Sequence, residues 1–313
     1  RKYIIPEKMV KAGKAILAIR VLDTGGNCGI WGDLYLRSTN DEQISLSGDW
    51  KYQVAADTHK VGALPVDRSV DPNLPTSLYN AMIHPLISYG IRGAIWYQGE
   101  NNSSRAYQYR ELFPLVIENW RRDWKQDFPF YFVQLANFMH EVSQPAESEW
   151  AELREAQMRA LAVGNTGMAV IDRGDANDIH PKDKQTVGHR LALIARAKTY
   201  GEKLPYSGPI YRSHQIVGNK IILSFDHTDG GLKSSDGKEL KGFAIAGRNH
   251  EFHWAKAEID GDKIIVSAPE AVPYPVAVRY AWANNPVCNL YNGAGLPASP
   301  FRTDDWRGIT QKD

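Results

Sequence analysis

Residues 174–181 read Gly-Asp-Ala-Asn-Asp-Ile-His-Pro, and this stretch decides the fold class through what stands on either side of it. An apolar run, Met168 to Ile171, precedes it, and a helical pattern begins near Asp183. The order strand, polar loop, helix is typical of an open α/β sheet. In such sheets, ligand sites form at the carboxyl ends of the strands.

The same loop places a histidine between carboxylates. Asp175 and Asp178 precede His180, and Pro181 restricts the backbone just behind it. An imidazole takes a proton from a hydroxyl nucleophile when a carboxylate holds its other ring nitrogen in one tautomer. The sequence therefore predicts a general base with an orienting acid. The alternative is a plain helix entry, in which Asp183 caps the helix and His180 is only a polar neighbour.

Composition excludes several classes of protein. The chain has 313 residues, of which 43% are hydrophobic and 23% charged, as in ordinary globular proteins of about two or three domains. A net charge of +1 without basic runs gives no reason to expect nucleic acid or an anionic membrane as partner. No apolar run approaches the roughly 18 residues of a membrane span. Cys28 and Cys288 match no metal-ligand spacing, so they are two free thiols or one bridge. We expect neither a metal nor an organic cofactor.

Four segments differ in character along the chain. Residues 1–60 suggest β structure, with strands expected at Ala15–Leu22, Leu34–Arg37, Gln43–Leu46 and Trp50–Val54. These are too few for a sandwich, which usually needs about seven strands, so we expect an incomplete β domain. Residues 61–75 are rich in Pro, Asp, Asn and Ser and suggest a linker. The amino terminus has neither an initiator methionine nor a signal-peptide pattern, which suggests that the sequence begins inside a longer protein.

The remaining two segments form an α/β block and a β block. In residues 76–203, strands expected at 91–97, 130–135 and 168–171 alternate with helices at 77–87, 104–124, 149–161 and 183–198. This alternation predicts a mostly parallel sheet covered on both faces. Residues 204–313 return to short strands at 220–225, 242–246, 255–259, 263–266 and 277–282, with Asp-Gly-Asp at 260–262 as a hairpin signal. They predict a second all-β domain, a small sandwich.

A second polar loop follows the strand at 91–97 and should lie on the same sheet edge as the histidine loop. Its glycine allows close approach of the backbone, and its amides are donors of the kind that an oxyanion hole needs. The candidates for oxyanion or substrate contact are Gln98, Gly99, Glu100 and Asn101. Glu100 alternatively serves only the dipole of the following helix. Trp96 and Tyr97 are either a surface for stacking a sugar or part of the core.

Four separated motifs carry a resemblance to a known family. They are Pro-Thr-Ser-Leu-Tyr-Asn-Ala-Met at 75–82, Ala-Ile-Trp-Tyr-Gln-Gly-Glu-Asn at 94–101, Asp-Ile-His-Pro at 178–181 with Lys184-Gln185, and Arg-Tyr-Ala-Trp at 279–282 with Leu-Pro-Ala-Ser-Pro-Phe at 296–301. Together they resemble the sialate O-acetylesterase family of SGNH (GDSL-like) hydrolases.

The resemblance implies an architecture and an activity. The fold implied is a flavodoxin-like SGNH core, here partial, with flanking all-β domains: an inserted jelly-roll-like domain, partial at 1–60, and a terminal β domain at 204–313. The implied activity is release of acetate from acetylated carbohydrate, of the 9-O-acetyl sialic acid type, with xylan or another glycan as the alternative. Because such substrates lie outside the cytoplasm, a secreted or periplasmic location is expected.

Site residues follow from the same resemblance. His180 matches the family's catalytic histidine, and residues 98–101 match the block lining the oxyanion hole. The family usually places the acid three residues before the histidine, which is Asn177 here. Asp178, two residues before, is the favoured acid and Asp175 the second candidate. A dyad with a backbone carbonyl in place of the acid is the third possibility.

The nucleophile is the main departure from the family. Its serine stands in a Gly-Gln-Ser-Asn motif, which this sequence lacks. Ser77, Ser103 and Ser104 stand at expected helix starts, where a capping role fits better. We therefore expect a missing amino-terminal segment to carry the serine as a partner of this chain. The alternative is that the chain is a non-catalytic carbohydrate-binding or structural fragment.

Overall fold

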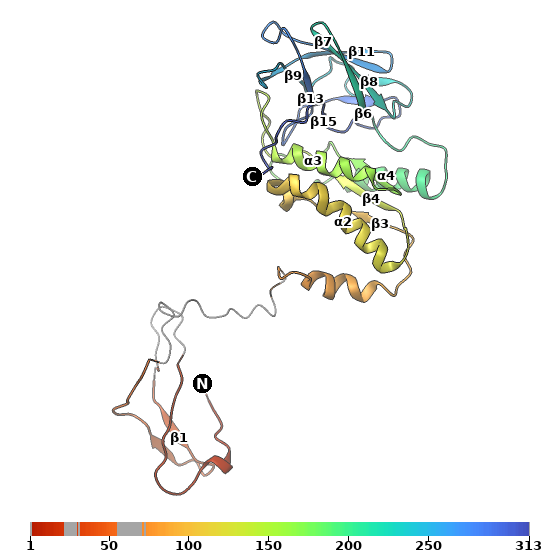
Figure 1. The fold of residues 1–313 in the computed structure, drawn as a ribbon. Coiled ribbons are helices and arrows are strands. Elements are labelled where there is room, and N and C mark those ends of the chain that lie inside the picture. The colour runs from red at the N-terminus through yellow and green to blue at the C-terminus, as the bar shows by residue number, and fades with distance from the viewer. Residues whose placement is uncertain (1, 22–29, 31, 55–70, 72, 313) are drawn as a thin grey trace. The chain divides into compact units, whose positions relative to one another are not determined.

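The computed structural model describes residues 2–21, 30, 32–54, 71 and 73–312. The chain divides into two compact units, Arg1–Asp71 and Pro72–Asp313, and each is described by itself (Figure 1). Most of the linker predicted at 61–75 lies outside the described residues.

The described part of the first unit contains one antiparallel hairpin. The strands predicted at 34–37 and 43–46 are present as β1 (Tyr35–Arg37) and β2 (Gln43–Ser45), which pair with Leu36 opposite Ile44. The short 3-10 helix η1 covers Glu7–Met9. None of the described side chains of this unit is buried.

The predictions of two other strands in the first unit are wrong for the residues that the structure describes. Residues 15–21 and 50–54 form no strand, and Ile16 is 99% exposed. A strand needs a partner for its backbone groups, and an apolar sequence does not supply one by itself. Within the described part, these runs lack that partner.

A three-stranded parallel sheet lies at the centre of the α/β part of the second unit. Strands β3 (Ala94–Trp96), β4 (Phe130–Gln134) and β5 (Thr166–Val170) stand in the order β3-β4-β5. Phe130 is opposite Ala94 on one side and Thr166 on the other. Every residue of β4 is buried. The prediction of a parallel sheet is confirmed.

Helices cover both faces of this sheet. Side chains alternate along β4, so successive residues meet helices on opposite faces. Phe130 and Phe132 pack against residues of α2 (Ala106–Trp124) and α3 (Glu149–Arg159). Val133 and Tyr131, from the other face, pack against α4 (Lys184–Ile194). Shorter helical turns complete this part: η2 (Tyr79–Ile83), η3 (His84–Leu86), η4 (Glu100–Arg105), η5 (Ala160–Ala162) and η6 (Ala195–Thr199).

The rest of the second unit is an antiparallel β region, drawn from green to blue in Figure 1. One four-stranded sheet has the order β10-β9-β13-β15, the other β11-β12-β7-β6, and β14 pairs with β8. Both four-stranded sheets contribute to one core that includes Ile221, Ile245, Val278 and Phe301. The strands are β6 (Ile210–Val217), β7 (Lys220–Asp226), β8 (Leu232–Ser234), β9 (Phe243–Ala246), β10 (Phe252–Trp254), β11 (Lys256–Asp260), β12 (Lys263–Ser267), β13 (Ala277–Tyr280), β14 (Leu290–Asn292) and β15 (Phe301–Arg302). The predicted hairpin of β11 and β12 is confirmed.

A buried arginine joins the α/β part to this β region. The Arg154 guanidinium donates hydrogen bonds to the backbone carbonyls of Leu135, Ala136, Ala283 and Asn284 at 2.7 to 3.0 Å. Burial lowers the pKa of Arg154 to about 10. Because the carbonyls of Leu135 and Ala136 follow directly on β4, Arg154 fixes the carboxyl edge of the sheet against the β region.

The fold class predicted from sequence is confirmed as an α/β core with a parallel sheet and flanking antiparallel β structure. The domain boundaries at residues 60, 75 and 203 stay predictions.

Candidate active site

The two predicted loops leave the same edge of the sheet. The loop at 98–101 follows β3, the loop at 174–181 follows β5, and β4 lies between them. The Nζ of Lys184, at the start of α4, lies 5.0 Å from the centroid of the Tyr97 ring at the end of β3. This cation–π contact links the two sides of the edge. Among the described residues, no hydrogen bond joins His180 to the loop at 98–101.

His180 and Asp178 are in direct contact. The His180 ring Nδ1 lies 3.2 Å from Asp178 Oδ1, and the His180 backbone N–H donates to the same oxygen at 2.9 Å. That backbone bond is the main reason why the pKa of Asp178 lies below its ordinary value, and the ring contact adds to it. With Nδ1–H directed at this carboxylate, Nε2 is the proton acceptor. The His180 side chain is 82% exposed.

Asp175, the second candidate acid, does not contact the histidine. Its Oδ1 accepts from the backbone N–H of Asn177 at 2.9 Å, and its Oδ2 lies 3.6 Å from Nζ of Lys182. Asp175 also forms an isolated parallel bridge with Phe138, beyond the end of β4. Its contacts are those of a residue that shapes the loop, so the geometry favours Asp178 as the orienting acid.

The cap of α4 belongs to a different residue. Asp183 accepts from the backbone N–H of Thr186 at 3.0 Å and from its hydroxyl at 2.6 Å. The helix-entry interpretation is therefore correct for Asp183. It leaves His180 outside the cap and without a structural partner other than Asp178 within the described chain.

The Gln98 side chain is held in place by its neighbours. Its Nε2 donates to Asn102 Oδ1 at 2.8 Å, and its Oε1 accepts from the Tyr109 hydroxyl at 3.0 Å. Asn101 is exposed. Glu100 begins η4, so the interpretation as a helix N-terminal carboxylate also fits the structure.

Gly99 stands where a side chain would be strained and crowded. Its φ is +145°, and an added Cβ would lie 3.1 Å from both Leu153 Cδ2 and Gln157 Nε2. Such a backbone is readily adopted only by glycine. The structure thus explains the residue type at this position, and its role in an oxyanion hole stays a prediction.

Gln157, on the helix expected at 149–161, was not among the candidate site residues. The Gln157 Nε2 donates to the carbonyls of Gln98 at 3.1 Å and Val133 at 3.2 Å, and Oε1 accepts from the Leu135 N–H at 2.9 Å. One fully buried amide thereby fastens the ends of β3 and β4. A glutamine at a core-facing position was the available signal.

Gln157→Leu is expected to lower the free energy of unfolding by about 2–4 kcal/mol, because three backbone groups lose their partner in a buried place. Urea denaturation monitored by circular dichroism measures this. The exposed Gln108, on α2, gives the control Gln108→Leu, which should change the stability by less than about 0.5 kcal/mol. Equal effects of the two substitutions would contradict the role of Gln157.

A second pair of residues holds the start of the histidine loop. The backbone N–H of Gly174 donates to Asn137 Oδ1 at 2.6 Å, and Asn137 Nδ2 donates to Asn285 Oδ1 at 2.7 Å. A Cβ at Gly174 would lie 1.7 Å from the carbonyl oxygen of Asn137. The loop is therefore anchored through Asn137 to the β region, a contact between segments far apart in sequence.

The two aromatic residues at the end of β3 are half-buried and pack against the core. Trp96 packs against Phe113 and Trp120, with ring centroids 6.2 and 5.7 Å apart, so the sugar-stacking interpretation is wrong for it. Tyr97 is half-buried, and burial, with Glu100 adding to the effect, raises its pKa to about 12.

The candidate serines do not meet the histidine in the described residues. Ser103 and Ser104 lie inside η4, and Arg105, not a serine, occupies the N-cap of α2, so the capping role expected for them is wrong. No serine hydroxyl of the described chain bonds to the His180 ring.

The described residues contain no cluster of three or more His, Cys, Asp or Glu side chains that could hold a metal ion. Cys288 is a free thiol, and Cys28 lies outside the part that the structure covers. None of the helices in that part is both long and apolar enough to cross a bilayer.

Comparison with known proteins gives consistent results. Residues 62–196 match a family described as carbohydrate esterase, sialic acid-specific acetylesterase. The sialate O-acetylesterase of Homo sapiens is 32% identical over 272 residues, which are 77% of this chain and 51% of that protein. The protein of the same name from Mus musculus is 33% identical over 268 residues, 76% of this chain and 49% of that protein. The chain thus spans about half the length of these curated relatives.

Solved structures are also similar to this chain. A carbohydrate acetylesterase from Xanthomonas citri superposes with a TM-score of 0.72 at 47% sequence identity, and the match covers 77% of this chain and 57% of that one.

Proposed function

This chain belongs to the family of sialic acid-specific carbohydrate acetylesterases, and from that premise we propose that it supplies the histidine side of a serine esterase site that releases acetate from acetylated sugars. The contact between His180 Nδ1 and Asp178 Oδ1 is the observation that carries the proposal, because it orients an exposed imidazole as a base.

The proposed reaction is acyl transfer in two steps. A serine oxygen attacks the acetyl carbonyl while His180 Nε2 takes the serine proton. The tetrahedral intermediate collapses, and the sugar oxygen leaves with the proton from His180. Water then attacks the acetyl-serine, with His180 again as base, and the serine oxygen takes the proton back from His180 as acetate departs. Donors of the loop at 98–101 face the oxyanion, and each such donor is typically worth about 3 kcal/mol.

We propose that the serine comes from a segment outside this chain, which adds strands beside β3 and completes a flavodoxin-like SGNH core. Two observations support this. The chain spans about half the length of its curated relatives. Within the described second unit, β3 is an edge strand, and Ile95 on it is 73% exposed. Parallel sheets are usually buried on both faces, and an apolar edge strand is a ready site for another strand. A secreted or periplasmic location remains part of the proposal, since acetylated glycans lie outside the cytoplasm.

One experiment on the complete protein distinguishes the two candidate acids. Asp178→Asn is expected to lower kcat for acetate release by on the order of 10²–10⁴-fold, because the imidazole loses its orienting carboxylate. Asp175→Asn, the matched control in the same loop, should change kcat by less than about tenfold, since Asp175 does not contact His180. Equal losses in the two variants would remove the distinction, and a larger loss for Asp175→Asn would reverse it.

A further inference from the structure

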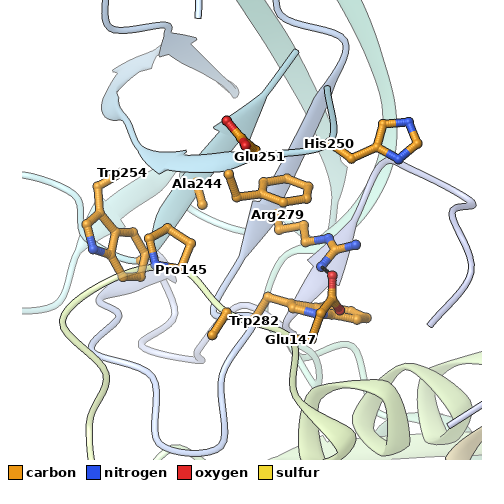
Figure 2. Close-up of a pocket in the computed structure, with 11 residues that line it drawn as sticks. Pro145, Glu147, Ala244, His250, Glu251, Trp254, Arg279 and Trp282 are labelled. Atoms are coloured by element: carbon orange, nitrogen blue, oxygen red, sulfur yellow. Dashed lines mark hydrogen bonds and ion pairs between the residues drawn. The ribbon is translucent and has the colours of Figure 1, made fainter. Parts of the chain in front are cut away.

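A cavity of about 310 Å³ opens in the second unit, between the loop that precedes α3 and the sheet of β9, β10 and β13 (Figure 2). Its volume reaches the range of small-molecule sites. The walls include Pro145, Glu147, Glu251, Trp254, Arg279 and Trp282. None of the residues at 98–101 or 174–181 lines it, so it is separate from the candidate active site.

One aromatic wall of this cavity is free to stack on a ligand. Trp254, on β10, is 41% exposed, and its Nε1 donates to the carbonyl of Ser143 at 2.9 Å, which fixes the indole. No ring or guanidinium group of the described residues stacks on it. The other large rings are already covered, because the Arg279 guanidinium lies over Phe252 at 4.2 Å and over Trp282 at 5.0 Å.

The cavity also offers polar atoms without partners in the described chain. Glu147 uses Oε1 for Arg279, at 2.8 Å, and Glu251 uses Oε2 for Asn249, at 2.9 Å, so each carboxylate keeps one oxygen available. The indole N–H of Trp282 is buried and has no acceptor among the described residues. A buried donor of this kind is uncommon. It has almost no surface open to the cavity, so the hydroxyls of a ligand are left to the two carboxylates.

The balance of charge selects the ligand class. Arg279 is the cation of the cavity, and it already donates to both carboxylate oxygens of Asp304, at 3.0 and 3.1 Å, in addition to Glu147. Glu251 adds a further negative charge. An anionic ligand therefore meets an excess of carboxylates, whereas the hydroxyls of a neutral sugar can donate to them.

We propose that this cavity binds one pyranose unit of a neutral glycan, stacked on Trp254, with its hydroxyls bonded to Glu147 and Glu251. The inference deepens the proposed function, on which its choice of a glycan rests: it holds the polysaccharide chain at a second place on the enzyme. The binding itself does not require acetyl transfer, so it is measured with sugars that carry no ester.

The test is isothermal titration of the purified full chain with xylotetraose, cellotetraose and N-acetylneuraminic acid. At least one neutral tetrasaccharide is expected to bind, and the anionic sugar to bind at least about tenfold more weakly. Trp254→Ala should lower the affinity for the neutral sugar by about tenfold or more, while Trp254→Phe, which keeps a ring, should retain most of the affinity. Tyr274→Ala is the matched control, because Tyr274 is an exposed aromatic of the same region that does not line the cavity.

Thermal unfolding of each variant separates lost binding from lost folding, and Glu251→Gln is a second probe of the same cavity. Binding of neither tetrasaccharide, tighter binding of N-acetylneuraminic acid, or unchanged affinity in folded Trp254→Ala would each overturn the proposal. Acetate release by the complete protein is measured in parallel. Neutral-sugar binding without acetate release would refute the proposed function and leave the cavity assignment standing.

Discussion

Replacing His180 by alanine in the complete protein is expected to lower kcat for acetate release by on the order of 10⁴–10⁶-fold, with little change in the unfolding temperature. The large effect follows from the role proposed for Nε2, which accepts and returns a proton in both steps. The small effect on stability follows from the exposure of the side chain and from its hydrogen bonds, which in the described chain are made only with Asp178.

A histidine on the neighbouring helix provides the control. His189, on α4, is exposed, and His189→Ala should leave kcat within about threefold of the wild-type value.

The acid side of the pH profile adds a further check. Because the pKa of Asp178 is lowered in the folded protein, this carboxylate stays ionised when an ordinary aspartate would begin to take up a proton. A loss of activity at a pH where an ordinary aspartate would begin to take up a proton should therefore not come from protonation of Asp178. A folded His180→Ala enzyme within tenfold of the wild type would refute the assignment.

The second large effect concerns the nucleophile. The 313-residue chain alone is expected to hydrolyse p-nitrophenyl acetate no faster than an equal concentration of free imidazole. Coexpression with the serine-bearing segment that we propose should raise the rate by at least about 10³-fold, because attack then comes from an activated serine hydroxyl. The chain alone is expected to be inactive because no serine hydroxyl of the described residues bonds to the His180 ring.

The same comparison tests the apolar surface of the first unit. Exposed side chains there include Tyr3, Ile4, Met9, Val10 and Tyr52, so this unit should associate when alone and become less prone to associate beside its partner segment. Sedimentation velocity of the chain with and without that segment measures this association.

For the nucleophile, rapid turnover by the chain alone, with one of its own serines labelled, would contradict the proposal.

The local sequence was enough to predict the parallel sheet and its site edge. The buried run at Phe130 to Gln134 and the strand before Gly174 are too apolar for any place but a sheet covered on both faces. Once both were strands followed by helices, the loops at 98–101 and 174–181 had to share an edge. Placing His180 and Asp178 together required only their spacing of two residues.

Other features depend on residues distant in sequence, and local patterns do not contain that information. Ala15 to Val21 has the composition of a buried strand but finds no partner in the described part of the chain. Gln157, Asn137 and Arg154 look like ordinary polar residues until the fold brings them to the backbone of other elements. Strand β6, eight residues long and largely exposed, lacks the alternation that would have revealed it.

Covalent labelling with diethyl p-nitrophenyl phosphate tests most directly whether His180 activates a serine for acyl transfer. The complete protein and its His180→Ala variant are incubated with the reagent, and the added mass is followed over time and located by peptide mapping. We predict one diethylphosphoryl group on a single serine outside residues 1–313 in the wild type, and labelling at least about 10³-fold slower in His180→Ala. Labelling of both proteins at the same rate, or no labelled serine in an enzyme that releases acetate, would contradict the mechanism.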